Sequence, residues 1–179
     1  MKAISLRTEY LKNPIGMDIL HTRLMWTCEG GTKQTAYRVV AKTDGQIVWD
    51  SGKVVSESMH ADDPNDLVSR QRVEWNVTLW DENDAEGETI EAFFEMGLLS
   101  ASDFAAKWIS GNYRVNKKKR YPVDCFKKEF FAHNVAKARL YITACGLYEA
   151  LVNGKRVGDF VLAPGHTDYT KRIQLQAYD

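Results

Sequence analysis

The chain has 179 residues, a length that allows one or two domains with buried cores. Its 24 Lys and Arg residues are balanced by 24 Asp and Glu residues, which argues against a nucleic-acid-binding protein and against a membrane-surface protein. The sequence holds no apolar run near the roughly 18 residues of a membrane helix, and its start turns polar too soon for a signal peptide, so we expect a cytoplasmic protein.

The first predicted strands show the alternation of apolar and polar residues that is typical of a half-buried strand. Residues 24–28 carry the first clear run, which ends at a pair of glycines, and residues 37–41 carry the next. The Asp-Gly pair at 44–45 then precedes a short run at 47–49. Because both residues of such a pair tolerate a positive φ, this spacing predicts a β-hairpin.

The clearest strand covers residues 73–79, and its expected partner covers residues 90–96. Between them, residues 81–87 resemble a calcium-binding loop only faintly, and we predict a charged hairpin connection there. Short strands separated by regular turns predict an all-β sandwich over residues 1–100, antiparallel and of immunoglobulin or fibronectin type III kind. The lack of a Cys…Trp…Cys framework favours the fibronectin-like type.

Residues 101–122 are predicted to be an interdomain linker with one short helical turn. Ser102 is the expected cap of that turn, because a serine hydroxyl accepts a hydrogen bond from a free backbone amide. The basic run at 117–120 is typical of a solvated loop.

Strands are expected again from Phe126 onward. Residues 139–144 alternate, and the Asn-Gly pair at 153–154 predicts a second hairpin. Residues 123–179 are too few for a jelly-roll-like sandwich of about eight strands. We therefore expect a truncated second β-sandwich domain, which covers its apolar face by packing on the first domain or by pairing with another copy.

Catalytic motifs are missing from the sequence. It contains no phosphate-binding glycine loop, no metalloprotease helix motif and no nucleophile elbow, and its four histidines lack the spacing of metal ligands. The three cysteines are an odd number without close spacing, and we predict buried, inert thiols. We expect no metal, no cofactor and no catalytic residue on this chain.

Several short blocks of sequence stand out along nearly the whole chain. In order they are EYLKNPIGMD (9–18), RLMW (23–26), QTAYRV (34–39), WDSGKV (49–54), FEMGLL (94–99), ARLYIT (138–143), GLYE (146–149), VNGKRVGD (152–159) and LAPGHTDY (162–169). Each block alone is weak evidence, but their order and spacing make chance similarity improbable. Together they resemble the N-terminal part of the bacterial α-L-rhamnosidases.

The resemblance implies a modular enzyme in which β-sandwich domains precede a large α-helical barrel that holds the active site. Such an enzyme hydrolyses terminal α-L-rhamnosides by an inverting mechanism that uses two acidic groups on the barrel. Both groups would lie beyond Asp179, so no catalytic residue is assigned here. The expected function is that of an N-terminal accessory region, whose partners are the rest of the parent enzyme and rhamnose-containing glycosides.

The resemblance also draws attention to residues 165–169. In some family members the second β domain resembles a rhamnose-binding module, which makes Asp168, with Tyr169 and His166, a candidate substrate-binding group. A structural interpretation stays open: a Pro-Gly turn in which Asp168 caps backbone amides and Tyr169 packs its ring. The family more often has Trp at position 166, and His there weakens a proposal of aromatic stacking on a sugar.

The tryptophans are predicted to be structural. Trp26, Trp49 and Trp75 fall on inward strand positions and are expected in the core. Trp80 and Trp108 lie at a strand end and in the linker, where we expect them to seal the junction between the two domains.

Two other functions are compatible with the residues. One is a free-standing fibronectin-like module that binds carbohydrate or protein and has no catalytic partner. The other is a segment that hydrolyses rhamnosides itself. In either case an uncovered sheet edge would allow a homo-oligomer to form.

Overall fold

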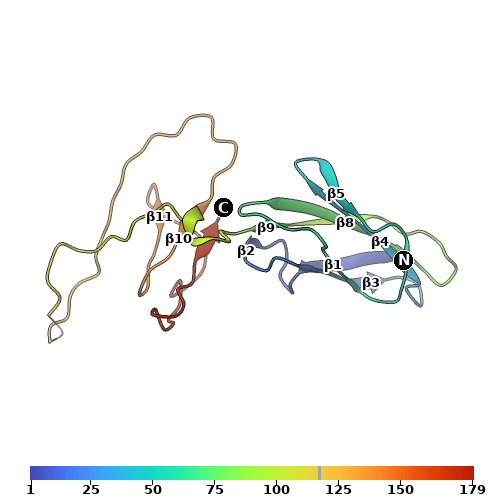
Figure 1. Ribbon diagram of the computed structural model, residues 1–179, viewed down its shortest axis with the longest axis horizontal. Coiled ribbons are helices and arrows are strands. Elements are labelled where there is room, and N and C mark those ends of the chain that lie inside the picture. Colours follow the sequence, from blue (N-terminus) through green and yellow to red (C-terminus); the bar gives the residue numbers. More distant parts are fainter. Residues whose placement is uncertain (117) are drawn as a thin grey trace.

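The computed structural model describes residues 1–116 and 118–179, so Lys117 of the predicted basic run lies outside the described residues. The molecule is elongated, with a β-sandwich in residues 1–100 and a looser region of extended chain and short strands after it (Figure 1). The all-β prediction is confirmed, since the helical structure described is a single 3₁₀ turn. No described helix has the length and apolar character needed to cross a membrane.

Two sheets form the sandwich. The larger has six strands, in the order β2 (Ile15–Met17), β9 (Ile90–Met96), β8 (Arg72–Trp80), β4 (Ala36–Thr43) and β5 (Gln46–Asp50), with β6 (Val54–Val55) also paired to β4. The smaller has three strands, in the order β1 (Lys2–Thr8), β3 (Arg23–Glu29) and β7 (His60–Asp62). All these pairs are antiparallel except β2–β9, which is parallel and departs from the purely antiparallel sandwich expected.

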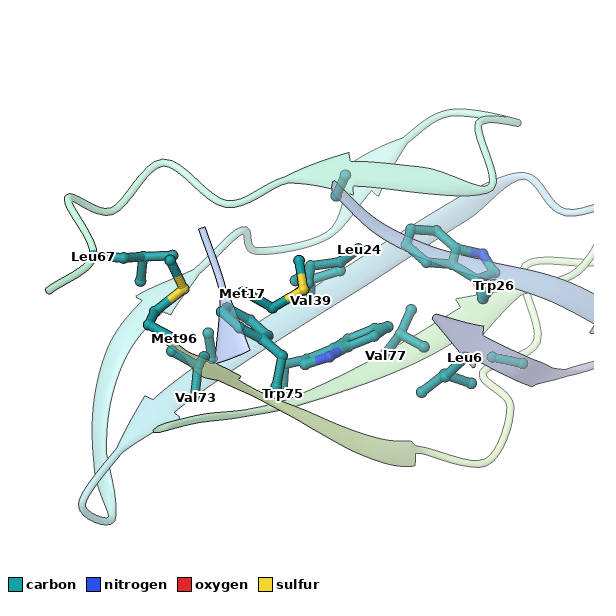
Figure 2. Close-up of a cluster of buried hydrophobic side chains, with 14 of the residues drawn as sticks. Leu6, Met17, Leu24, Trp26, Val39, Leu67, Val73, Trp75, Val77 and Met96 are labelled. Atoms are coloured by element: carbon teal, nitrogen blue, oxygen red, sulfur yellow. The ribbon is translucent and has the colours of Figure 1, made fainter. Parts of the chain in front are cut away.

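The alternation in the sequence correctly predicts which face of each long strand is buried. Val73, Trp75, Val77 and Leu79 all point into the core from β8, and Phe94 joins them from β9. Figure 2 shows Val73, Trp75 and Val77 of the larger sheet on the side of Leu6, Leu24 and Trp26 of the smaller one. The core therefore lies between the two sheets, where each sheet excludes water from the other.

The predicted Asp-Gly hairpin is confirmed. Asp44 has φ 50° and Gly45 has φ 77°, so both turn residues adopt the left-handed conformation that a tight hairpin requires. The loop at 81–87 is also a hairpin connection, in which the Oδ1 atom of Asp81 accepts backbone hydrogen bonds from Asn83 and Ala85.

Two of the tryptophan predictions are wrong. Trp26 and Trp75 are buried and Trp49 packs against the core, as expected. Trp80 does not seal a domain junction. It ends β8 at the end of the sandwich that is opposite residues 123–179, which we call the second β region. Trp108 does not seal one either, because 63% of its surface is exposed.

The short helical turn is present, but Ser102 is not its cap. Turn η1 (Ala101–Asp103) is capped by Ser100, whose hydroxyl accepts from the Ser102 amide, while the Asp103 carboxylate accepts from the Ser100 amide. This capping box satisfies amides at the start of the turn. The observed cap, Ser100, lies two residues before the predicted one.

After the turn, regular structure is sparse. Residues 104–116 and 118–139 contain no strand, which contradicts the expectation that strands resume at Phe126. The second β region has two short pairs, β10 (Leu140–Ile142) with β13 (Gln176–Tyr178) and β11 (Leu151–Val152) with β12 (Lys155–Arg156). The predicted Asn-Gly hairpin joins β11 to β12, with φ 50° at Asn153 and 77° at Gly154.

Part of the second β region packs on the sandwich, with Ala177 of β13 against Gly16 of β2, but many of its apolar side chains stay exposed. Phe131 is 94% exposed, and Phe126, Phe130 and Val123 are exposed as well. Strands β10 and β13 are half-buried, whereas Leu151 and Val152 of β11 are exposed. The cysteine prediction fails in part: Cys125 and Cys145 are exposed, and Cys28 is half-buried.

Candidate functional site

The candidate substrate-binding residues lie on one loop that follows Ala163. Ala163 is buried, and its carbonyl accepts a hydrogen bond from the Tyr148 amide at 2.8 Å, which ties the start of the loop to the second β region. Beyond it, Nδ1 of His166 lies 2.8 Å from the Tyr169 hydroxyl, and the two rings meet edge to face at 5.2 Å. The structure therefore brings His166 and Tyr169 together at the surface.

Asp168 organises the turn of this loop. Its Oδ1 atom accepts from the Thr170 hydroxyl at 2.6 Å and from the Thr170 amide at 3.1 Å, while its carbonyl accepts from the amides of Lys171 and Arg172, both at 2.9 Å. The Thr170 hydroxyl, followed by the Thr170 amide, holds the pKa of the Asp168 carboxyl below its usual range. These contacts are those of a turn-capping aspartate. The Asp168 side chain is 56% exposed, and its Oδ2 lies 3.8 Å from the Lys171 Nζ.

A second polar cluster in this region was missed by the sequence analysis. The Oε1 atom of Gln176 accepts from the hydroxyls of Tyr148 at 2.6 Å and Tyr178 at 2.9 Å, and the two hydroxyls lie 3.1 Å apart. Burial, and then the hydrogen bond with Tyr178, raises the pKa of Tyr148 well above its usual range. The three groups satisfy one another, so this cluster ties Tyr148 to β13.

Neither of two open hollows on the surface includes the candidate loop. One, of about 440 Å³, lies between β1 and β9 and is lined by Ser5, Leu6, Arg7, Lys12, Asn13, Ile90, Glu91 and Ala92. The other, of about 700 Å³, lies beside the start of β8 and is lined by Thr43, Asp44, Asp66, Val68, Ser69, Arg70, Gln71, Arg72 and Lys137. Across the described residues, no group of three or more His, Cys, Asp and Glu side chains could hold a metal ion.

The strongest electrostatic feature joins the sandwich to the second β region. Glu95 of β9 is 1% exposed, and its carboxylate accepts from Lys137 Nζ at 2.8 Å, from Arg139 Nε at 2.8 Å and from Arg139 Nη2 at 3.0 Å. Burial raises the pKa of Glu95, but the hydrogen bonds from Arg139 and Lys137 together outweigh it and leave the pKa below its usual range. Arg139 also pairs with Asp179.

Comparison with known families accounts for nearly the whole chain. A family model described as the Rha78A-like, N-terminal immunoglobulin domain matches residues 3–100, and one described as the α-L-rhamnosidase N-terminal domain matches residues 133–179. The first description supports an immunoglobulin-like sandwich, while the fibronectin type III label stays a prediction.

Individual relatives agree with the family models. The chain is 34% identical to an α-L-rhamnosidase of Formosa agariphila over 96% of this chain and 21% of that protein. It is 31% identical to one of Alteromonas sp. strain LOR over 99% of this chain and 22% of that protein. The solved α-L-rhamnosidase from Dictyoglumus thermophilum superposes with a TM-score of 0.80 at 31% identity, over 100% of this chain and 23% of that chain.

The chain thus spans about a fifth of the length of the relatives it matches. In each case the match covers almost all of this chain and only a small part of the relative. The chain therefore belongs to the α-L-rhamnosidase family, and it corresponds to the N-terminal β-sandwich region of that family.

Proposed function

We propose that the chain is the accessory N-terminal region of an enzyme that hydrolyses terminal α-L-rhamnosides, and that it supports the rest of that enzyme without performing the chemistry. The observation that carries the proposal is the match to about a fifth of each rhamnosidase relative. The exposed phenylalanines of the second β region support it, because apolar side chains in such numbers usually mark a surface that another part of a protein covers.

The test is hydrolysis of a chromogenic α-L-rhamnoside by the 179-residue chain and by the longer parent protein that its own gene encodes. We expect the longer protein to release the chromophore and the 179-residue chain to be inactive. Hydrolysis by the short chain would contradict the accessory role. A longer protein without rhamnosidase activity, or a gene that encodes no longer protein, would contradict the assignment and favour a free-standing binding module.

A second role, contact with the sugar, is proposed for His166, Asp168 and Tyr169. Two observations favour it: an exposed carboxylate with an oxygen free of the turn hydrogen bonds, and a pair of rings at the surface beside it. Carboxylates accept hydrogen bonds from vicinal hydroxyls, and ring faces pack on the apolar side of a sugar. The turn-capping role of Asp168 is compatible with this contact, because the turn uses Oδ1.

Titration of the 179-residue chain with L-rhamnose, followed by NMR, tests the sugar contact. We expect shifts in residues 165–170 that weaken in a Tyr169→Ala variant, with D-glucose as the control sugar. The Asp168→Asn variant keeps an acceptor for Thr170 and removes the charge, so it separates the turn from the contact. Equal shifts with both sugars, or none with rhamnose, would contradict the assignment.

The exposed faces of the second β region have two competing occupants, the rest of the parent enzyme and a second copy of this chain. Light scattering of the 179-residue chain distinguishes them. A 179-residue chain that stays monomeric, and whose exposed faces become covered only within the longer protein, supports the first. A stable dimer of the short chain supports the second.

A further inference from the structure

One end of the sandwich contacts the second β region. We call this end the docking edge and define it by three residues: Gly16 on β2, Glu95 on β9 and Arg70 in the loop before β8. Figure 1 shows that β2 and β9 point toward the second region, while the N-terminus lies at the opposite end of the molecule.

Glu95 faces away from the sandwich core and yet is buried. Its neighbours Phe94 and Met96 are both 0% exposed within the core, so the alternation of the strand turns Glu95 to the outer face. Glu91, four residues earlier on that same face, is exposed. Two residues from outside the sandwich, Lys137 and Arg139, reach its carboxylate and help to bury it.

The ion pairs leave the carboxylate well satisfied. Arg139 contacts both oxygens of Glu95, through Nε to Oε1 and through Nη2 to Oε2, and Lys137 adds a contact to Oε2. A two-pronged arginine contact fixes orientation as well as distance. Removing one partner of a buried ion pair is strongly destabilising, because it leaves a buried charge uncompensated.

The backbones of the two regions also come close at this edge. A Cβ atom placed on Gly16 would lie 2.9 Å from the Cβ of Ala177 on β13, so a larger residue at 16 would push the second region away. Gly16 has φ 81°, which a glycine adopts without strain. The Arg70 guanidinium lies 5.8 Å from the centre of the Tyr141 ring on β10 and also donates to the Asp103 carbonyl at 2.9 Å.

We propose that the docking edge is a specific interaction surface of the sandwich, that its partner is the strand pair β10–β13 with the preceding Lys-x-Arg segment, and that the Glu95 carboxylate holds this partner in place. The partner's chemistry matches the surface: two cations at alternate positions meet one buried carboxylate, and a small residue, Ala177, meets a glycine. The proposal concerns the two halves of this chain and does not depend on what the parent enzyme hydrolyses.

Hydrogen–deuterium exchange on the 179-residue chain tests it, with the Glu95→Gln variant against Glu91→Gln as the matched control. Glu91 lies on the same face of the same strand, but it is exposed and makes no ion pair among the described residues. We expect Glu95→Gln to speed exchange of amides in 140–142 and 176–178 at least about tenfold, and Glu91→Gln to leave it unchanged. Equal rates in the two variants would overturn the proposal.

The Arg139→Gln variant gives the same test from the other side and leaves the sandwich sequence intact, which matters if Glu95→Gln disturbs the sandwich itself. The expected result is faster exchange in β13 with unchanged exchange in β8. In the double variant the two effects should be clearly less than additive, since both remove one interaction. Additive effects, or an unchanged β13 in Arg139→Gln, would show that the ion pair does not hold the two regions together.

Discussion

Residues 1–100 and residues 101–179 contain similar apolar side chains but place them differently. Phe94 in the sandwich is 0% exposed, whereas Phe131 in the second region is 94% exposed. Phe94 lies on β9, whose apolar face packs in the core of the sandwich, whereas Phe131 lies on a segment without a strand. The difference shows that an apolar side chain is buried only where a second layer packs over it.

The largest expected effect tests this difference directly with two matched substitutions. Phe94→Ala should lower the free energy of unfolding of the sandwich by about 3–5 kcal/mol, because it removes a buried ring and leaves a cavity. Phe131→Ala should change it by less than about 0.5 kcal/mol. Urea unfolding followed by the fluorescence of the buried tryptophans measures both. Similar losses in the two variants would show that Phe131 is buried in solution.

Acid should separate the two regions before it unfolds the sandwich. Because the pKa of Glu95 is lowered in the folded chain, its stabilising contribution is present above its unfolded pKa of about 4.3 and is lost as the pH falls through the folded pKa. The charged groups around it are Lys137, Arg139, and Arg72 on the neighbouring strand, with Asp179 pairing Arg139.

We expect exchange in β10 and β13, corrected for the intrinsic pH dependence, to rise roughly tenfold as the pH falls through the lowered pKa of Glu95, while β8 stays protected. The Glu95→Gln variant supplies the control. Its amides in β10 and β13 should already exchange fast at pH 7, and their exchange should show no further increase in acid. A simultaneous loss of protection in all three strands would mean that the regions unfold as one unit.

The two hairpins offer a third test. Gly45 and Gly154 both have φ 77°, and a Cβ atom on either would meet no other atom within 4 Å, so substitution by alanine tests backbone strain alone. Gly45→Ala should lower the stability of the sandwich by about 1–2 kcal/mol. Gly154→Ala should leave the urea transition of the sandwich unchanged, because β11 and β12 contribute no layer to its core. A shift in that transition would show that the regions are coupled beyond the docking edge.

The smallest expected effect concerns Asp63, whose charged carboxylate is buried within the sandwich at a cost to stability. Asp63 is 1% exposed, and its Oδ1 accepts from the Asn65 amide and side chain, while its Oδ2 has no hydrogen-bond partner among the described residues. Burial raises its pKa, so its contribution to stability is greatest below its unfolded pKa of about 3.9 and is lost as the pH rises through the folded pKa.

Asp63→Asn keeps the Oδ1 acceptor and removes the charge. We expect it to stabilise the sandwich by about 1 kcal/mol at pH 7 and to have little effect near pH 3. Thermal unfolding at the two pH values provides the measurement. A variant that is less stable at pH 7 would mean that the Asp63 charge has a partner in solution.

Local patterns explain which features the sequence predicts. The alternation at 73–79 identifies the buried face of β8, and the Asp-Gly and Asn-Gly pairs identify both hairpins, because these signals depend on neighbouring residues. The turn at Asp168 is predicted for the same reason, whereas its contact with a sugar stays a prediction. The strand expected at Phe126 is absent: residues 126–132 read FKKEFFA, which does not alternate between apolar and polar, and the structure places no strand there.

Features that depend on distant residues could not be predicted in this way. Glu95 occupies an outward position, where alternation favours a solvated side chain, and its partners are 42 and 44 residues further along the chain. The cluster likewise joins Tyr148 to Gln176 and Tyr178 of β13, which are 28 and 30 residues further along the chain. No local signal distinguishes these residues from other polar residues on strands.

The placement of the first and last strands of the sandwich has a mechanical consequence. The N-terminus precedes β1 at one end of the molecule, and the chain leaves β9 at the other, next to the second region (Figure 1). A pulling force applied between Met1 and the second region would therefore run nearly along both strands. Hydrogen bonds between β1 and β3, and between β9 and its neighbours, would be loaded together in shear instead of opening one by one. We expect a high rupture force in single-molecule pulling, with the docking edge yielding first.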